Sequence, residues 1–299
     1  MSKKSSPLPI KKGVSPNSLW LKEGRWGSML DFFLSQFPHL DTQSCLSRFE
    51  SGEVMTDDGH RLNSYDPYCP GKHIFFYREL SQEIKVPFEE EIIYQDENIL
   101  VVDKPHFLPV APSGSYLHET LIVRLRNRLN IDSLELCHRL DRETAGVVLL
   151  TKEPKYRGVY QSLFAERKIT KTYQAIAKKI ELKLPLKRRS QLVKGQPYFR
   201  MKEQKGEANS ETYINLLKVK KEFALYQLVP VTGKKHQLRV HMASIGTPIL
   251  NDPLYPRVNM KASDDFSNPL QLLAKSLEFV DPLTGKKCFF ESGKELVVP

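Results

Sequence analysis

The sequence predicts an α+β protein whose main feature is a mixed, largely antiparallel β-sheet with flanking helices. Segments with the pattern of strands outnumber helical segments, and most of these strands have a sequence neighbour close enough to pair with. The pattern also changes near residue 88, from short scattered elements to long strands. We therefore expect a flexible arm over residues 1–25, a small α+β unit over residues 26–80 and a larger domain over residues 88–299.

The small unit should contain one helix and two short strands. Apolar residues recur at helical spacing at Leu30, Phe33, Leu34 and Phe37. Residues 52–54 and 74–77 read as strands, the first followed by the turn Asp57-Asp58-Gly59. The residues before 26 are rich in Lys, Ser and Pro and lack periodicity, which predicts the arm. The polar residues 81–87 predict a linker.

The larger domain should begin with a hairpin, in which residues 92–94 and 99–102 flank the turn Asp96-Glu97-Asn98. A short buried strand is expected at residues 147–150. Further strands are expected at 170–177, 209–219, 223–231, 277–280 and 288–290. The last two flank the turn Asp281-Pro282-Leu283-Thr284-Gly285.

Three helices should flank this sheet. The apolar face of the first consists of Leu121, Ile122, Leu125 and Leu129. Its outer face is expected to carry Arg124, Arg126 and Arg128. Pro154 suits the first turn of the second helix, and the third should run from about Lys235 to Gly246.

The net charge of +10 is unevenly distributed. Residues 1–90 hold 11 Lys and Arg against 12 Asp and Glu, whereas residues 91–299 hold 34 against 23. Such an excess is either an ordinary solvated surface or a face that binds a polyanion. The larger domain is therefore the candidate for contact with nucleic acid.

Several classes of protein are disfavoured by composition. No apolar run approaches the ~20 residues needed to span a bilayer, and the polar start of the chain has no apolar signal region behind it. We expect a cytoplasmic protein with no membrane contact. The four cysteines have neither C-x-x-C nor zinc-finger spacing and should be free thiols. No metal or cofactor is predicted.

The segment His138-Arg139-Leu140-Asp141-Arg142-Glu143-Thr144-Ala145-Gly146 leads into the buried strand at 147–150. An acid between two arginines would sit at the mouth of the sheet, where nearby cations favour the ionised carboxylate. In isolation, an ordinary loop carboxylate in a salt bridge is the better explanation of this segment.

Two further segments combine unusual residues. In Lys171-Thr172-Tyr173-Gln174-Ala175, Tyr173 and Ala175 share one strand face, which leaves an aromatic shelf with space above it. In Thr232-Gly233-Lys234-Lys235-His236-Gln237-Leu238-Arg239-Val240-His241, the helical spacing puts His236 and Arg239 on one polar face. Taken alone, the first segment is also compatible with a tyrosine at the edge of the core, and the second is also compatible with a helix that has a solvated basic face.

The three segments together, in this order, resemble the RluA-type family of pseudouridine synthases. The resemblance covers roughly residues 88–292 and also includes Val102-Asp103-Lys104-Pro105, Gly246-Thr247-Pro248-Ile249-Leu250-Asn251-Asp252 and the stretch 272–279. It implies an enzyme that converts uridine to pseudouridine in ribosomal or transfer RNA. That reaction is redox-neutral and needs no cofactor, and the flipped uridine has to leave its stack.

The resemblance also implies the roles of individual residues. The catalytic residues are Asp141, Tyr173 and Arg239. Asp141 is the essential carboxylate, either as a nucleophile or as a base, and Arg239 keeps it charged. Tyr173 stacks on the flipped uracil and is a candidate to assist removal of the proton from carbon. Arg139 fills the space left by the extruded base, and Lys171, Lys234 and Lys235 contact phosphate, as does the basic run 187–189. The remaining residues expected to contact substrate or RNA are His138, Arg142, Thr144, His236, Gln237 and Leu273.

The chain departs from the family pattern at several positions. Lys234 and Lys235 stand where an arginine and a small hydroxyl residue are usual, and a lysine cannot reproduce the arginine fork. Asn251 replaces a glycine, and Leu273 replaces a histidine. The unit at 26–80 resembles a degenerate form of the small RNA-binding module often fused to these enzymes. We expect a monomer.

Three other functions are alternatives, and the ordered set of motifs argues against one of them, a generic basic protein that binds ribosomes structurally. A non-catalytic RNA-binding protein of the same fold would be expected to lack Asp141 or Arg239, and both are present. A zinc-dependent base deaminase requires H-x-E with P-C-x-x-C, and neither motif occurs. The sequence does not specify which uridine is the target.

Overall fold

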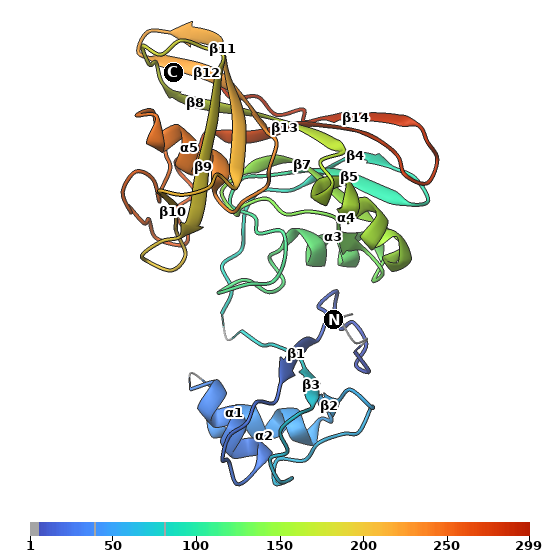
Figure 1. The fold of residues 1–299 in the computed structure, drawn as a ribbon. Helices are drawn as coiled ribbons and strands as arrows, with labels where there is room; N and C mark the ends of the chain where they lie inside the picture. The colour runs from blue at the N-terminus through green and yellow to red at the C-terminus, as the bar shows by residue number, and fades with distance from the viewer. Residues whose placement is uncertain (1–5, 39, 81) are drawn as a thin grey trace. The chain divides into compact units, whose positions relative to one another are not determined.

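The computed structural model describes residues 6–38, 40–80 and 82–299. The chain divides into two compact units (Figure 1). The first consists of Met1–Glu83 with Gly114–His118, and the second of Ile84–Ser113 with Glu119–Pro299. Within the described ranges, no helix is both long and apolar enough to cross a bilayer.

The first unit combines a three-stranded antiparallel sheet with two helices. Its sheet has the order β1-β3-β2 and is built from β1 (Asn17–Trp20), β2 (Val54–Thr56) and β3 (His73–Phe76). The helices are α1 (Met29–Gln36) and α2 (Thr42–Glu50). Ser28 and Asp31 form a capping box on α1, and the Asp41 carboxylate accepts the Ser44 amide N–H at the start of α2. Aromatic residues, with Phe33 at 0% exposure, fill the space between the helices and the sheet.

Three elements expected in this unit are present, as α1, β2 and β3. The arm expected over residues 1–25 is wrong in part, because residues 17–20 form β1 and Leu21 is buried. Residues 1–5 lie outside the described residues, as does Ser81 of the expected linker. Helix α2 escaped prediction because its sequence is mostly polar, with Cys45 and Phe49 as its buried apolar residues.

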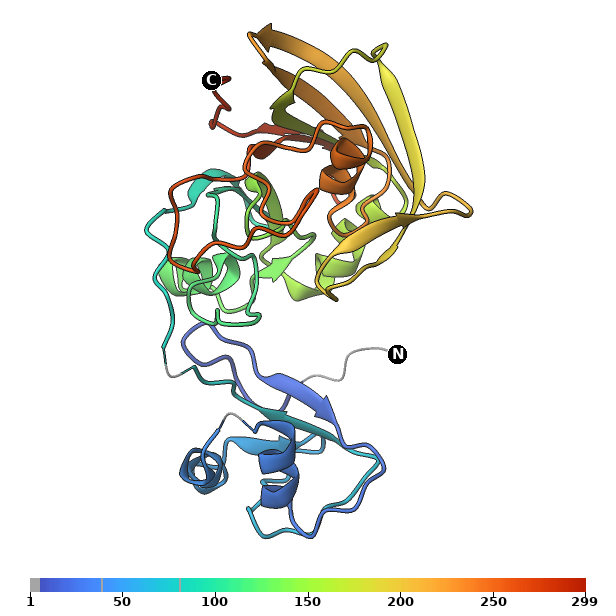
Figure 2. The same ribbon diagram turned by 90° about the vertical axis from the view of Figure 1, so that its left-hand side faces the viewer.

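The second unit is built on an 11-stranded sheet with the order β10-β9-β11-β12-β8-β13-β7-β5-β4 (Figures 1 and 2). Two short additions complete it, since β14 pairs with β13 and β6 pairs with β7. The strands are β4 (Glu91–Gln95), β5 (Ile99–Lys104), β6 (Glu135–Leu136), β7 (Ala145–Thr151), β8 (Ile169–Lys178), β9 (Leu186–Lys194), β10 (Met201–Gln204), β11 (Ser210–Lys220), β12 (Phe223–Pro230), β13 (Leu272–Val280) and β14 (Lys287–Glu291). The helical elements are α3 (Leu121–Leu129), η1 (Pro154–Tyr156), α4 (Arg157–Ala165) and α5 (Gln237–Ser244).

Two hydrophobic clusters fix the helices α4 and α5 to this sheet. Tyr160 and Leu163 of α4 pack on apolar residues of β5, β7 and β13. Leu238 and Met242 of α5 pack on β8, β11, β12 and β13. Strand β13 contributes residues to both clusters. The two helices therefore pack on neighbouring parts of the sheet, which adjoin at β13.

The α+β class and the largely antiparallel sheet are as the sequence predicts, including the hairpins β4–β5 and β13–β14. Strands β9 and β10 were not predicted, because basic and polar residues dominate them. The expected outer face of α3 is wrong at Arg126. This side chain is 4% exposed, and its guanidinium donates to the Leu134 carbonyl oxygen.

The pairing of β7 with β13 is parallel and very short, with Leu273 opposite Ala145 and Ala274 opposite Gly146. Gly146 has φ +114°, and a Cβ added there would lie 2.2 Å from the Ala274 carbonyl oxygen. Only glycine permits this approach of the two backbones. The contact therefore sets how closely the segment 138–144, just before β7, lies to β13.

We predict that Gly146→Ala lowers the free energy of unfolding by at least about 2 kcal/mol, because positive φ and backbone overlap act together. Gly158→Ala is the matched control, since a Cβ at this position in α4 meets nothing within 4 Å. We expect it to raise stability by about 0.5–1 kcal/mol. Urea unfolding of both variants measures the difference, and equal stability of the two would show that β7 and β13 do not need the glycine.

Candidate active site

Three adjacent strands in the middle of the sheet carry the chemistry-bearing residues. Asp141 lies just before β7, and Tyr173 lies on β8. Strand β13 runs between them, and its Ala274 is paired with Gly146 on one side and with Tyr173 on the other. Residues more than 100 positions apart in the sequence are thereby brought to one place.

The Asp141 loop, residues 139–144, is a tight turn held through its backbone. The Thr144 amide N–H donates to the Asp141 carbonyl oxygen at 3.1 Å. The Glu143 carbonyl oxygen lies 2.6 Å from Nδ1 of His106. Since the neighbouring backbone is fixed, the Asp141 carboxylate has little freedom to move away from its partners.

Lys104, at the end of β5, binds the same loop through a backbone carbonyl oxygen. Its fully buried Nζ donates to three carbonyl oxygens, at 2.9 Å to Pro105, 2.8 Å to Leu108 and 3.2 Å to Arg142. Burial lowers the pKa of Lys104 to about 7, although the charges of Glu143 and Asp141 act to raise it. The three oxygens replace the water that a buried ammonium has lost.

Arg239 of α5 is the direct partner of Asp141. Its Nη1 lies 3.2 Å from Oδ2 of Asp141 and 3.9 Å from Oε2 of Glu143. Burial alone would lower the pKa of Arg239, but the hydrogen bonds and charge of Asp252, followed by the charges of Asp141 and Glu143, raise it. The Arg239 side chain is 1% exposed, so at this residue the basic face of the helix is buried and aimed at the carboxylates, and the alternative of a solvated face does not hold.

His236 precedes α5 in the left-handed conformation, with φ +54°. Its Nδ1 lies 2.9 Å from the Tyr255 hydroxyl oxygen, and its Nε2 lies 3.8 Å from Oδ2 of Asp141. Burial lowers the pKa of His236 to about 4, which outweighs the opposite effect of the Asp141 charge. The imidazole is therefore neutral at pH 7 and lines the site without adding a second cation.

Tyr173 is packed at the edge of the cluster under α5. Burial, followed by the charge of Asp141, raises the pKa of Tyr173. The phenol is therefore protonated at neutral pH. Its ring offers an aromatic surface close enough to Asp141 for the two groups to interact electrostatically.

Several residues expected to contact substrate or RNA are instead engaged inside the protein. Nε2 of His138 accepts the Leu149 amide N–H at 3.0 Å, and its ring stacks on Phe164. Gln237 donates to the Glu211 carbonyl oxygen and accepts from the Thr232 hydroxyl. The other residues whose side chains are buried are Thr144, Lys171 and Leu273. These side chains hold the loops in place, and a direct RNA contact for them is not supported.

The expected cations at the surface are divided in the same way. Arg139, Lys234 and Lys235 are exposed, as a phosphate contact requires. Arg142 instead donates to the Phe107 and Ser263 carbonyl oxygens. In the basic run 187–189, each cation has an acidic partner, either Glu211 or Glu203.

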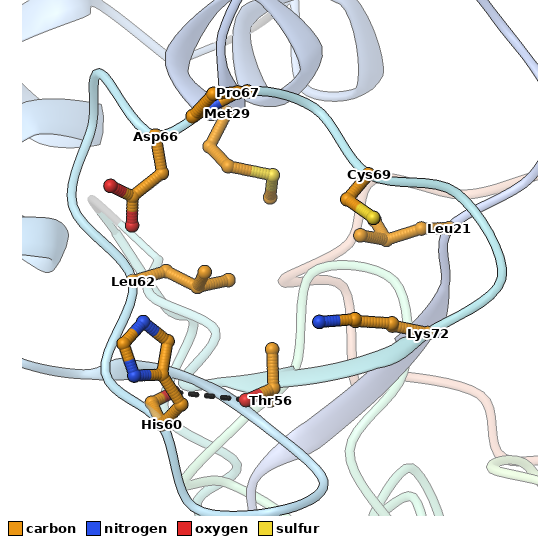
Figure 3. A pocket seen from close by; sticks show the side chains of 9 residues that line it. All are labelled: Leu21, Met29, Thr56, His60, Leu62, Asp66, Pro67, Cys69 and Lys72. Carbon is orange, nitrogen blue, oxygen red and sulfur yellow. Dashed lines mark hydrogen bonds between the residues drawn. The ribbon is translucent and has the colours of Figure 1, made fainter.

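A pocket of about 160 Å³ occurs in the first unit (Figure 3). Its lining residues lie between Leu21 and Lys72, and none of the site residues described above is among them. It is lined by apolar residues such as Met29 and Leu62 and by polar residues such as His60 and Lys72. None of its lining residues was singled out by the sequence. No group of three or more His, Cys, Asp or Glu residues with metal-binding geometry is present among the described residues.

Three residues of the site were given no role by the sequence reasoning. Lys104 and Asp252 stood within matching segments but were not singled out, and Glu143 was passed over although it lies within the first motif. The signal was available in the sequence for Lys104, because a lysine two residues after the apolar run of β5 must be either exposed or paired. Nothing local indicates that Asp252 pairs with Arg239.

Comparisons with known proteins show which family this chain is similar to. Residues 98–244 match the family described as RNA pseudouridylate synthase. Ribosomal large subunit pseudouridine synthase C of Buchnera aphidicola subsp. Acyrthosiphon pisum is 30% identical over 243 residues, which cover 75% of this chain and 72% of that protein. The mitochondrial tRNA pseudouridine(32) synthase of Saccharomyces cerevisiae is 27% identical over 77% of this chain, and the match spans about half, 51%, of the yeast protein.

A solved structure gives the same result. Human RNA Pseudouridylate Synthase Domain Containing 4 superposes with a TM-score of 0.54 at 26% identity, over 67% of this chain and 87% of that chain. The similarity therefore extends from the sequence to the arrangement of the strands.

We predict that Lys104→Met lowers the free energy of unfolding by about 3 kcal/mol or more, because it leaves three buried carbonyl oxygens without a donor. It should also speed hydrogen exchange of the Thr144 amide. The control is Lys275→Met, since Lys275 donates to the Ser292 and Lys294 carbonyl oxygens, away from the Asp141 loop. Unchanged exchange at Thr144 in the Lys104 variant would show that the loop does not depend on this lysine.

Proposed function

The chain belongs to the RluA-type family of RNA pseudouridine synthases, and on this basis we propose that it isomerises uridine in ribosomal or transfer RNA with Asp141 as its essential carboxylate. The single observation that carries the proposal is the Asp141–Arg239 pair at the meeting point of β7, β13 and β8. Such enzymes are isomerases, so no atom is gained or lost.

The position of Asp141 suits reaction with a substrate. The side chain is 28% exposed although its partner Arg239 is 1% exposed, so the carboxylate is reachable from outside while its counter-ion is not. Among the described residues, the hydrogen bond from Arg239 and the contact with the neutral His236 both involve Oδ2 of Asp141, and they leave Oδ1 available. Both roles open to Asp141, attack on the ribose ring carbon and removal of a ribose proton, need an ionised oxygen that faces the substrate.

The reaction requires three changes in the nucleotide. The bond from the ribose to N1 of uracil breaks, the freed base turns, and a bond forms from the ribose to C5. The hydrogen on C5 is then lost as a proton, and N1 is protonated. A base stacked within RNA cannot be reached, so the uridine is first extruded into the site.

Tyr173 serves in this proposal as the surface on which the extruded uracil stacks. Its phenol is protonated at neutral pH, and Tyr173 lies close enough to Asp141 for the two side chains to interact electrostatically. Arg139 fills the place that the base has left, and Lys234 and Lys235 contact phosphates near the site. The three cations are exposed, which supports these contacts.

The finer points of organisation are part of the same proposal. We assign the catalytic domain to residues 88–299 and a small RNA-binding-like module to residues 26–80. A monomer in the cytoplasm is proposed as well, and the described free thiols suit a reducing compartment.

We predict that Asp141→Asn lowers turnover at least about 100-fold, since the amide can neither attack nor accept a proton. The fold and the RNA affinity should be kept, because the two side chains have nearly the same size and Asp252 still compensates the charge of Arg239. Release of tritium from RNA labelled at C5 of uridine measures turnover, and a filter assay measures affinity. Turnover above about a hundredth of the wild-type rate would contradict the role given to Asp141.

We predict that Tyr173→Phe keeps normal RNA affinity, because the ring remains, whereas Tyr173→Leu weakens capture of the extruded base. Loss of a stacked ring costs about 1–3 kcal/mol, which is roughly 5- to 150-fold in affinity. Binding is measured with the Asp141→Asn background, so that the RNA stays unconverted. The same affinity for the Phe and Leu variants would remove Tyr173 from the uracil site.

A further inference from the structure

Asp252 is the most completely engaged carboxylate beside the proposed active site. Its fully buried side chain holds Arg239 through two bonds, with Oδ2 at 2.8 Å from Nε and Oδ1 at 2.7 Å from Nη2. These two bonds use one whole edge of the guanidinium and fix its plane. Nη1 is left over, and it is the nitrogen that reaches Asp141.

The guanidinium is thus shared unequally between two carboxylates. Asp252 takes two short, parallel hydrogen bonds, whereas Asp141 receives a single longer bond of 3.2 Å. The Tyr255 ring lies against the guanidinium, with its centroid 5.5 Å from Cζ, and limits its rotation. Without Asp252, the same guanidinium could turn and pair two of its nitrogens with Asp141, which would occupy both reactive oxygens.

We propose that Asp252 is a positioning residue, which acts on the reaction by holding Arg239 so that Asp141 is given one hydrogen bond and keeps a free oxygen. The proposal rests on the proposed function, since it concerns the carboxylate that reacts with uridine. Asp252 does not touch the substrate, and its effect passes entirely through Arg239. It therefore changes the rate of the chemical step more than the binding of RNA.

A purely structural role is the alternative, because Oδ1 of Asp252 also accepts the Leu254 and Tyr255 amide N–H groups at 2.8 and 3.1 Å. The chain contains a close match for that role. Oδ1 of the buried Asp281 accepts the Leu283 and Thr284 amide N–H groups at 2.8 and 2.9 Å, and its Oδ2 accepts the Tyr160 hydroxyl. Asp281 therefore provides a control with the same local turn and no arginine.

The test is a double-mutant cycle with Asp252→Asn, Arg239→Lys and the combination of both, assayed by tritium release from uridine-labelled RNA. We expect Asp252→Asn to lower kcat about 10- to 100-fold, because a small displacement of a catalytic group costs this much. KM should stay within about twofold. If Asp252 acts through Arg239, the double variant is within about threefold of Arg239→Lys alone.

Asp281→Asn should lower the melting temperature yet keep kcat within about twofold of wild type. Asp252→Ser serves as a second variant should the Asn variant fold poorly, because its hydroxyl can still accept the turn N–H groups. It should show the same loss of kcat.

The outcomes are distinguishable. If the wild-type protein converts RNA and both Asp252 variants keep the same kcat, the proposal is overturned. Additive effects of Asp252→Asn and Arg239→Lys in the cycle would also overturn it. Protein that converts no RNA as wild type would overturn the proposed function and this inference with it.

Discussion

The arrangement of the site depends on one buried cation. Arg239 is almost completely removed from solvent, and a guanidinium in that position is tolerated only when carboxylates compensate its charge. They come from separate parts of the chain, Asp141 and Glu143 before β7 and Asp252 between α5 and β13. Neutralising this cation therefore requires that α5, β7 and the segment around residue 252 meet at one point. This requirement links the fold to the chemistry, because the contacts that compensate the buried charge of Arg239 also align Asp141.

Residues of the sheet also hold the Asp141 loop in place. Lys104 binds the backbone of the Asp141 loop through the Arg142 carbonyl oxygen, while Arg239 binds its side chain. Gly146 allows β7 to approach β13 closely enough for the loop to lie near Tyr173. The loop is thereby held by two basic side chains with different roles: Lys104 fixes its main chain, and Arg239 binds the Asp141 carboxylate. Such preorganisation lowers the cost of reaching the reactive geometry.

Much of the fold was predictable because its signals are local. The β4–β5 and β13–β14 hairpins have apolar strands and clear turns, and the helix after Pro154 has an apolar stripe. Strands β9 and β10 were missed because their residues are polar, and their pairing partners are set by the sheet. The order of the motifs pointed to Asp141, Tyr173 and Arg239, and the structure brings these three together. The sequence could not show that His138, Lys171 and Gln237 turn inward. A polar side chain can form a hydrogen bond with a backbone group or with a phosphate, and the sequence does not distinguish the two.

Conversion of uridine to pseudouridine in RNA through Asp141 is the proposed function of this chain. The most direct measurement is a map of pseudouridine across ribosomal and transfer RNA from cells that lack the gene, and from the same cells complemented with wild-type protein or the Asp141→Asn variant. We expect one or a few positions to lose pseudouridine on deletion and to regain it only with the wild-type protein. Recovery of those positions by the Asn variant, or maps that do not change on deletion, would contradict it.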